Sequence, residues 1–402
     1  MRDTFRNKQV AIVLYGIVDE RSIKTARALV SAGAQVTIIA LTHNRRDFSE
    51  ETFTLRYEDP AEPRPSTSPN RLLRIAKNLS INKAITSYLR AKKGLFAYRA
   101  LKEVLLELQP DFVHVVNADV LAGAAEAAQS LGIPFIYEAY EYWPEHAYEE
   151  ACRLTSAERS FLVCSERKYA ACAAAFITVS PYLARLYQEK LSLMQMPQVI
   201  FNTPVKYLKT AKPSHRPPQL LFLGNLQEDR NLKTLLDAVT LAKDLHLTFQ
   251  GSGPLQAYLL NEVKQRGLGD RVRIKEPVPY QELVYSLQEY DLGVYCSLPY
   301  NRQVDGALPN KIFEYLSGGL ALACTPTAAL KEFPNFAHFG TYINPETAAS
   351  LSEDLVSIIR DRGSLSAMKR ASLEEAAKYG GSLQADKLCA LYEGLLEGEK
   401  SP

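Results

Sequence analysis

The residues best suited to chemistry lie at the start of one expected helix. The run from Leu308 to Leu316 reads LPNKIFEYL, and its proline suits a first helical turn, where the missing N–H is not needed. The free N–H groups of a helix N-terminus favour an anion such as a diphosphate. Lys311 adds a counter-charge, and Glu314 can accept hydrogen bonds from ribose hydroxyls. The alternative is a plain surface ion pair between these two side chains.

Two glycine-containing turns offer backbone that a ligand can approach. Gly224 and Asn225 follow an apolar run, and Arg230 lies a few residues on. Glycine at a strand's carboxyl end permits close approach, and arginine can bind phosphate oxygens with two N–H groups. The alternative is an ordinary turn with a surface arginine. The second turn, GSGP at 251–254, lacks the third glycine of the dinucleotide fingerprint, so we interpret it as a tight turn only.

The hydrophobic pattern predicts the framework that must position these residues. In the second half we expect strands at 220–223, 247–250, 272–274 and 292–295, with helices near 232–243, 254–266 and 280–289. In the first half we expect strands at 10–14, 35–40, 112–116, 135–137, 176–179 and 199–201, with a helix at 21–32 and another ending near 130. This alternation predicts an α/β fold of two Rossmann-like, doubly wound parallel sheets facing a central cleft.

Changes in composition predict the domain boundaries. Residues 203–218 are rich in proline and lysine with little periodicity, which indicates an interdomain linker. The linker separates an N-terminal domain at 1–202 from a C-terminal domain at 219–380. A final helix within 381–402 is expected to pack back toward the N-terminal domain.

Composition and charge narrow the class of protein. A chain of 402 residues, 47% hydrophobic and 23% charged, is long enough for two globular domains. A formal net charge of +2 gives no overall signal for nucleic acid, which is therefore not an expected partner. The 6 cysteines form no C-x-x-C pair, which predicts free thiols and no metal site. The apolar runs are too short for a signal peptide or a membrane span, so we expect a cytoplasmic protein.

One stretch interrupts the alternation of strands and helices. Residues 70–102 contain 9 Lys or Arg and no Asp or Glu, with apolar residues interleaved. This pattern is typical of a basic amphipathic helical region. It favours peripheral binding to an anionic membrane, at the inner face of the plasma membrane, with the solvated face of a crossover as the alternative.

Short motifs recur in a fixed order along the chain. They read DERSIK at 19–24, PDFVH at 110–114, YEAYEYWPE at 137–145, FITVS at 176–180, VIFNTP at 199–204, GSGP at 251–254 and PNKIFEY at 309–315. This order resembles that of the family 4 glycosyltransferases of the GT-B fold, in particular the bacterial branch with a P-[SN]-K-[IL]-F-E-Y motif. The resemblance covers nearly the whole chain.

The resemblance implies a nucleotide-sugar donor site in the C-terminal domain and a retaining transfer that needs no metal and no cofactor beyond the donor, a UDP- or GDP-sugar. Glu314 would hold the ribose, while Lys311 and Arg230 would stabilise the diphosphate, and these three are the expected catalytic residues. The remaining expected donor contacts are Gly16, Gly224, Asn225, Val278 and Asn310. Of these, Val278 would lie near the base, and Gly16 would face the phosphates from the N-terminal domain.

The resemblance also implies an acceptor side in the N-terminal domain. The expected residues there are Arg21, Asn117, Asp119, Tyr140 and Glu141. A glycan or a lipid-linked sugar is the expected acceptor, in bacterial cell-surface polysaccharide or glycoconjugate synthesis. His114, within an expected strand, is interpreted as a core residue.

The sequence departs from the family pattern at three places. Many relatives carry an acid eight residues before the glutamate of the motif, whereas this chain has Gly306 there, next to Asp305. Asn225 stands where an arginine is common. In the acceptor-side segment, Tyr140 replaces the family's histidine and Glu138 its aspartate.

Three other functions remain open from the sequence. The first is a nucleotide-sugar epimerase on the same fold. The second is a non-catalytic binding or scaffolding partner, which Gly306 and Asn225 favour. The third, a nicotinamide-dependent enzyme, is disfavoured because no full G-x-G-x-x-G follows the first strand.

Overall fold

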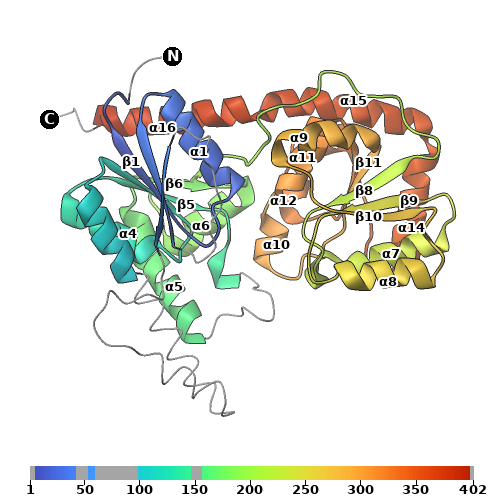
Figure 1. The fold of residues 1–402 in the computed structure, drawn as a ribbon, viewed down its shortest axis with the longest axis horizontal. Coiled ribbons are helices and arrows are strands. Elements are labelled where there is room, and N and C mark those ends of the chain that lie inside the picture. The colour runs from blue at the N-terminus through green and yellow to red at the C-terminus, as the bar shows by residue number, and fades with distance from the viewer. Residues whose placement is uncertain (1–4, 42–52, 59–97, 146–155, 399–402) are drawn as a thin grey trace, which may run out of the picture. The chain divides into compact units, whose positions relative to one another are not determined.

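A computed structural model describes residues 5–41, 53–58, 98–145 and 156–398 of the chain (Figure 1). The chain divides into two compact units. The N-terminal unit comprises Met1–Val179, Leu183–Ile200 and Ala385–Pro402, and the C-terminal unit comprises Ser180–Tyr182 and Phe201–Gln384. Each unit is a Rossmann-like domain built on one parallel sheet.

The N-terminal sheet has seven parallel strands in the order β3-β2-β1-β4-β5-β6-β7. Its strands are β1 (Gln9–Tyr15), β2 (Gln35–Leu41), β3 (Thr54–Glu58), β4 (Phe112–Val116), β5 (Phe135–Ala139), β6 (Ala175–Thr178) and β7 (Gln198–Val199). Its helices include α1 (Glu20–Ser31), α4 (Leu121–Leu131), α5 (Ser156–Tyr169), α6 (Pro181–Leu191) and the terminal α16 (Gly381–Gly398). Short 3-10 turns occur at Trp143–Glu145 and Ala170–Cys172.

The C-terminal sheet has six parallel strands in the order β10-β9-β8-β11-β12-β13. Its strands are β8 (Gln219–Leu223), β9 (His246–Gln250), β10 (Val272–Lys275), β11 (Leu292–Tyr295), β12 (Ala321–Cys324) and β13 (Gly340–Tyr342). Its helices are α7 (Leu232–Leu241), α8 (Gln256–Gln265), α9 (Tyr280–Ser286), α10 (Arg302–Gly306), α11 (Asn310–Gly318), α12 (Ala328–Lys331), α13 (Phe336–Phe339), α14 (Ala348–Arg360) and α15 (Arg362–Tyr379). Two 3-10 turns, Glu228–Arg230 and Leu287–Glu289, complete it.

Burial on both faces explains why the central strands read as continuous apolar runs. All residues of β4, β5, β11 and β12 are buried, as expected for strands of a parallel sheet that helices cover on both sides. In the C-terminal unit, alternate residues of β8 enter two cores. Phe222 packs with α7, α8 and α14, whereas Leu221 packs with α9, α11 and α13.

The terminal helix α16 completes the core of the N-terminal unit. Leu388, Tyr392 and Leu396 are buried with Phe5 and Phe112. The Tyr392 ring makes edge contacts with both phenylalanines, at centroid distances of 6.1 and 5.6 Å. The N-terminal core therefore combines residues from the first half of the chain with residues of α16.

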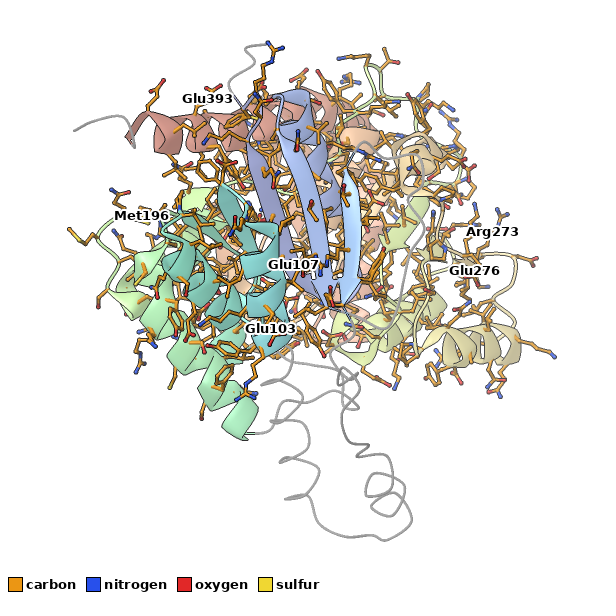
Figure 2. All side chains as sticks on the ribbon, turned by 60° about the vertical axis from the view of Figure 1, so that its left-hand side comes forward. Glu103, Glu107, Met196, Arg273, Glu276 and Glu393 are labelled. Carbon is orange, nitrogen blue, oxygen red and sulfur yellow. The ribbon has the colours of Figure 1, made fainter. Side chains whose placement is uncertain are left out.

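The first 28 residues of the basic stretch at 70–102, residues 70–97, lie outside the described residues. The described part of the stretch begins a helical segment that spans residues 98–108. Leu101, Val104 and Leu105 are buried, whereas Glu103 and Glu107 are exposed (Figure 2). This segment is thus amphipathic, with an apolar face in the core and a charged outer face.

The structure confirms the α/β class with two parallel sheets and differs in detail from the expected elements. The expected helix at 280–289 ends early, because α9 stops at Ser286 and a 3-10 turn follows. The strand expected at 199–201 is β7, Gln198–Val199. The apolar pattern of the sequence does not predict strands β3, β12 and β13.

Candidate functional site

The loop after β8 brings glycine backbone next to Lys311. Gly224 has φ +126°, a conformation that side chains rarely adopt, and its amide donates to the Gln250 carbonyl at 3.0 Å. A Cβ at this position would lie 3.2 Å from Lys311 Nζ. The carboxyl end of β8 and the first turn of α11 therefore meet at one point.

Aromatic rings surround the Lys311 ammonium group. Its Nζ lies 4.1 Å from the centroid of the Phe222 ring and 5.9 Å from that of Tyr295. Within the described residues, Lys311 forms no hydrogen bond or ion pair. Burial, followed by the charge of Arg230, lowers the pKa of Lys311 to about 7. An anionic ligand at this position would supply the counter-charge that the protein leaves out.

Arg230 is the second cation near this point. It ends the 3-10 turn Glu228–Arg230, and about a third of its side chain is exposed. Its Nη1 lies 3.4 Å from Asp229 Oδ2, and the same carboxylate oxygen accepts a hydrogen bond from the Tyr300 hydroxyl at 3.3 Å. Its charge contributes to the lowered pKa of Lys311, so the two cations act on the same region.

The glycines of the GSGP turn serve close packing. A Cβ on Gly251 would fall 1.9 Å from the Gly224 carbonyl oxygen, and one on Gly253 would fall 2.5 Å from that of Leu226. The Leu226 amide donates to the Ser252 carbonyl at 2.9 Å. The two loops are packed backbone to backbone, which confirms the interpretation of 251–254 as a tight turn.

The other expected donor residues have different surroundings. Glu314 is partly buried on α11, and its charge counteracts the lowering of the Lys311 pKa, which places the two groups near each other. Asn225 and Asn310 are exposed. Val278 is partly buried and packs against the core that contains α9 and α11.

Asp305 and Gly306, near the position where many relatives carry an acid, both make contacts with other segments. Asp305 Oδ1 accepts the Ala328 amide at 2.7 Å, so this carboxylate caps the start of α12. Gly306 is buried, and its carbonyl accepts a hydrogen bond from the Ser180 hydroxyl. Asp305 therefore joins α10 to the start of α12.

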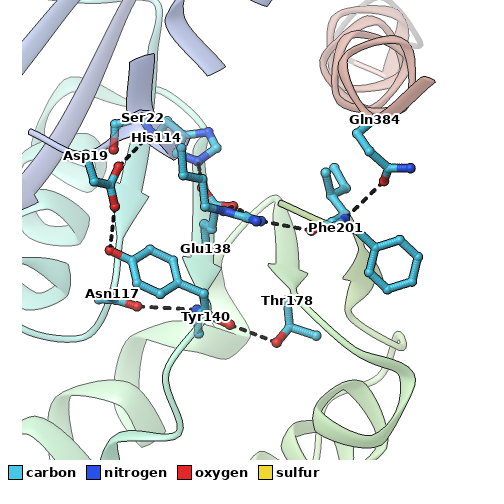
Figure 3. A network of polar contacts seen from close by, with 12 residues as sticks. Asp19, Ser22, His114, Asn117, Glu138, Tyr140, Thr178, Phe201 and Gln384 are labelled. Atoms are coloured by element: carbon cyan, nitrogen blue, oxygen red, sulfur yellow. Dashed lines mark hydrogen bonds and ion pairs between the residues drawn. The ribbon is translucent and has the colours of Figure 1, made fainter. Parts of the chain in front are cut away.

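In the N-terminal unit, Glu138 and His114 belong to a buried network (Figure 3). The network includes Arg21, a residue expected on the acceptor side. Arg21 forms an ion pair with Glu138 and donates to the Ile200 carbonyl at 2.9 Å. His114 bonds the other oxygen of Glu138 at 2.8 Å and the Tyr392 hydroxyl at 2.9 Å. His114 is fully buried, so its interpretation as a core residue is confirmed.

The network fixes the charge of Glu138. Burial alone would raise the pKa of this carboxyl, but Arg21 and His114 together hold it down at about 2. Arg21 is only 7% exposed, so its guanidinium stabilises the fold around α1, β5 and Ile200. The sequence does not reveal this pairing, because 117 residues separate the two partners.

Two polar residues tie the loops at the carboxyl ends of β4 and β5 (Figure 3). Asn117 has φ +65°, and its Oδ1 accepts the Tyr140 amide at 3.3 Å. The Tyr140 hydroxyl donates to Asp19 Oδ2 at 3.1 Å, and the other Asp19 oxygen accepts the Ser22 amide at the start of α1. Burial, followed by the Asp19 charge, raises the pKa of Tyr140.

The two remaining residues expected on the acceptor side are carboxyls whose pKa is raised. Burial, followed by the charge of Glu141, raises the pKa of Asp119 to about 8. Burial, followed by the charge of Asp19, raises the pKa of Glu141 to about 7. Gly16, on the first loop of this unit, has φ +92°, and no atom lies within 4 Å of where its Cβ would be.

Each of the two units matches a family of known proteins. Residues 21–200 match the family described as glycosyl transferase 4-like domain, and residues 207–378 match glycosyl transferases group 1. A D-inositol 3-phosphate glycosyltransferase of Catenulispora acidiphila is 26% identical over 192 residues, which is 44% of each chain. The chain belongs to the family 4 glycosyltransferases of the GT-B fold. The alignment with this curated relative thus spans less than half of that protein's length.

Solved structures share the fold of this glycosyltransferase at low sequence identity. A sucrose-phosphate synthase from Thermosynechococcus elongatus has a TM-score of 0.73 at 15% identity, covering 98% of this chain and 100% of its own. HepE of Anabaena, solved in complex with UDP, has a TM-score of 0.68 at 12% identity, covering 96% of this chain and 100% of its own. These likenesses concern the fold.

The described part of the glycosyltransferase contains neither a membrane-spanning helix nor a metal-binding cluster. None of its helices is long and apolar enough to cross a membrane. No group of three or more His, Cys, Asp or Glu side chains there has the arrangement of a metal site.

Proposed function

We propose that this glycosyltransferase is a retaining, metal-independent enzyme that moves a sugar from a nucleotide-sugar donor to a glycan or lipid-linked acceptor, in bacterial cell-surface polysaccharide or glycoconjugate synthesis. The observation that carries the proposal is the partly buried Lys311 ammonium group, which has no anionic partner in hydrogen-bonding contact among the described residues. The Anabaena protein of the same fold has been solved with UDP and with UDP-glucose, which supports a nucleotide-sugar donor.

In the proposed reaction the C-terminal unit stabilises the leaving diphosphate. Lys311 and Arg230 face the negative charge that develops as the bond to the anomeric carbon breaks, and the low-polarity surroundings of Lys311 strengthen this interaction. The start of α11 contributes N–H groups. Glu314 accepts hydrogen bonds from the ribose, and Val278 lies near the base.

The test is a thermal-shift screen of the full chain against UDP, GDP and their common sugar conjugates, with and without EDTA. A ligand at one hundred times its dissociation constant stabilises the native state by about 2.7 kcal/mol, which is readily measured. We expect a shift with one nucleotide class, unchanged by EDTA, lost in Lys311→Met and reduced in Glu314→Ala. The exposed Lys331→Met is the matched control and should keep the full shift.

The second candidate is a binding or scaffolding partner that has lost catalysis. Many relatives carry an acid at the position of Gly306, and in this chain the neighbouring Asp305 instead caps a helix. This arrangement favours the second candidate. No shift with any conjugate, from well-folded protein, would favour this candidate. A shift without transfer to any added acceptor, but with a changed sugar in the recovered donor, would instead indicate an epimerase.

A further inference from the structure

The side chain of Arg230 is held loosely in a turn whose backbone is fixed. The Cys296 thiol donates to the Arg230 carbonyl at 3.4 Å, and the side-chain amide of Asn231 donates to the Pro345 carbonyl at 2.8 Å. Among the described residues, the guanidinium has one ion-pair partner, Asp229, with 3.4 Å between Nη1 and Oδ2. This separation exceeds the distance of about 2.7–2.9 Å that is usual for a charge-assisted hydrogen bond. The arginine side chain is therefore free to change partners while its backbone stays in place.

The same oxygen of Asp229 has a second hydrogen-bond donor. The Tyr300 hydroxyl donates to Oδ2 at 3.3 Å. Asp229 lies in the turn after β8 and Tyr300 in the loop after β11, and these two strands are parallel neighbours. Both residues therefore lie beyond the carboxyl ends of their strands, at one edge of the sheet. Because Tyr300 and Arg230 share one oxygen, Tyr300 keeps the carboxylate hydrogen-bonded when Arg230 leaves it.

Asp229 is an anion beside two cations. Burial, followed by the charge of Arg230, lowers the pKa of Lys311 to about 7, and the charge of Asp229 acts in the opposite direction. Asp229 thus offsets part of the repulsion between Lys311 and Arg230. A diphosphate at this position brings negative charge to the same two cations, and two anions that contact one guanidinium repel each other. A bound sugar nucleotide therefore favours separation of Arg230 from Asp229.

We propose that Asp229 is a counter-ion that Arg230 exchanges for the diphosphate of the sugar nucleotide, and that Tyr300 is the positioning residue that holds Asp229 during the exchange. In the free protein, Asp229 partly neutralises Arg230. In the complex, the guanidinium binds phosphate oxygens, and the Tyr300 hydroxyl keeps the carboxylate in its turn. The inference rests on the proposed function, because it concerns the sugar nucleotide of that same reaction.

The experiment measures sugar-nucleotide affinity of the full chain by isothermal titration calorimetry at pH 6, where Lys311, with a pKa of about 7, is mostly charged. The titrant is whichever of UDP-glucose, UDP-N-acetylglucosamine and GDP-mannose gives the largest thermal shift. Asp229→Asn removes the competing charge, so the dissociation constant should fall about two- to fivefold, the range expected for a partly exposed ion pair. A merely structural role of Asp229 would instead weaken binding.

The second variant tests the tyrosine. Tyr300→Phe removes the hydroxyl alone, so the carboxylate loses its remaining hydrogen-bond donor once Arg230 leaves, and the dissociation constant should rise about twofold or more. Combined with Asp229→Asn, the same change should have no further effect, because the tyrosine acts through that carboxylate. The double variant should therefore bind as tightly as Asp229→Asn alone.

The matched controls lie in the same region but outside the exchange. Glu228 is the neighbouring acid of the same turn, and its Oε1 lies 2.7 Å from Lys233 Nζ. Glu228→Gln removes the same charge as Asp229→Asn and should change the dissociation constant much less. Tyr258 is an exposed tyrosine on α8, and Tyr258→Phe should bind like the unaltered protein. Thermal unfolding shows whether each variant folds.

Three results would overturn the inference. They are weaker or unchanged binding by Asp229→Asn, an effect of Tyr300→Phe that is absent or that persists in the double variant, and equal tightening by Glu228→Gln. Binding by the unaltered protein without the opposite effects of the two single variants contradicts the inference alone. If the unaltered protein binds none of the three conjugates, the proposed function fails, and the inference fails with it.

Discussion

Lys311 has a chemically unusual position for a lysine. Its surroundings are aromatic, its neighbouring cation is Arg230, and its pKa is lowered to about 7 by burial first and that cation second. The free protein is thus divided between the charged and the neutral lysine near neutral pH. A diphosphate favours the charged form, so donor binding takes up a proton.

This linkage predicts that donor affinity falls as the pH rises above 7. The diphosphate diester of a sugar nucleotide does not titrate in this range, so the pH dependence reports the lysine. Above the pKa of the free lysine, the dissociation constant of the sugar nucleotide should rise about tenfold per pH unit. The rise should stop at the pKa of the lysine in the complex. Calorimetry between pH 6 and pH 8.5 measures the trend. A Lys311→Met variant should bind weakly with a flat profile, and an equally flat profile in the unaltered protein would contradict the linkage.

Gly224 carries a separate prediction at the same scale. Its φ is +126°, and a Cβ added here would lie 3.2 Å from Lys311 Nζ, so alanine strains the backbone and displaces the lysine. Gly224→Ala should destabilise the protein by about 1–3 kcal/mol and weaken donor binding.

The matched control for Gly224→Ala is Gly269→Ala, where a Cβ meets no atom within 4 Å and φ is not positive. Urea unfolding and the nucleotide shift give the two measurements. Equal behaviour of the two alanine variants would show that the loop after β8 has no special conformation.

At the scale of elements, the buried pair Arg21–Glu138 joins α1 to β5. Glu138→Gln leaves the buried guanidinium without its counter-charge and should cost about 3–5 kcal/mol. The exposed pair of Arg56 and Glu107, 3.2 Å apart, provides the control, because Glu107→Gln should cost about 0–1 kcal/mol. Trp143 is the 1 tryptophan of the chain and lies in the N-terminal unit, so its fluorescence follows the unfolding of that unit.

The same pair gives a pH dependence with a defined sign. The pKa of Glu138 is lowered from 4.5 to about 2, so its ionised form stabilises the fold fully above pH 4.5, and this stabilisation is lost as the pH falls toward 2. The unaltered protein should therefore lose stability more steeply between pH 5 and pH 3 than Glu138→Gln. If stability falls with pH equally in the unaltered protein and in Glu138→Gln, the acid instability does not come from Glu138.

How much of this could be predicted depends on the range of the interactions. Periodicity and chain order predict the two parallel sheets, because the apolar pattern of each strand and helix is local. The position of Lys311 beside Gly224 follows from the family order. The burial of Arg21 against Glu138, and the use of Asp305 as a cap, could not be predicted, because each depends on contacts between residues far apart in sequence.

The sequence does not predict strands β3 and β13, because their local apolar signal is weak. Strand β3 is short, partly exposed and polar at both ends, so its sequence TLRYE has little apolar signal. Strand β13 has three residues and gains its place from pairing with β12. The Asp119–Glu141 pair was assigned to the acceptor side by resemblance, but its raised pKa values depend on burial that no local pattern shows.

At the scale of the whole molecule, the basic stretch at 70–102 predicts association with anionic membranes. Replacing Arg71, Arg74, Lys92 and Lys93 by glutamine should reduce binding to phosphatidylglycerol vesicles, since each basic side chain near the headgroups contributes about 1 kcal/mol. Vesicle co-sedimentation measures this, with phosphatidylcholine vesicles as the neutral reference.

The charge-matched control replaces four exposed lysines of the C-terminal unit. They are Lys206, Lys212, Lys264 and Lys331. An equal loss of vesicle binding in both quadruple variants would show that net charge, and not the stretch at 70–102, determines association.

The place of α16 affects how the protein is made. Tyr392, Leu388 and Leu396 belong to a core whose other members are found within the first 200 residues. A ribosome releases these three side chains only after the entire C-terminal unit has been synthesised. The nascent N-terminal unit must therefore wait, with part of its apolar surface uncovered and His114 without its tyrosine partner, until α16 has been synthesised.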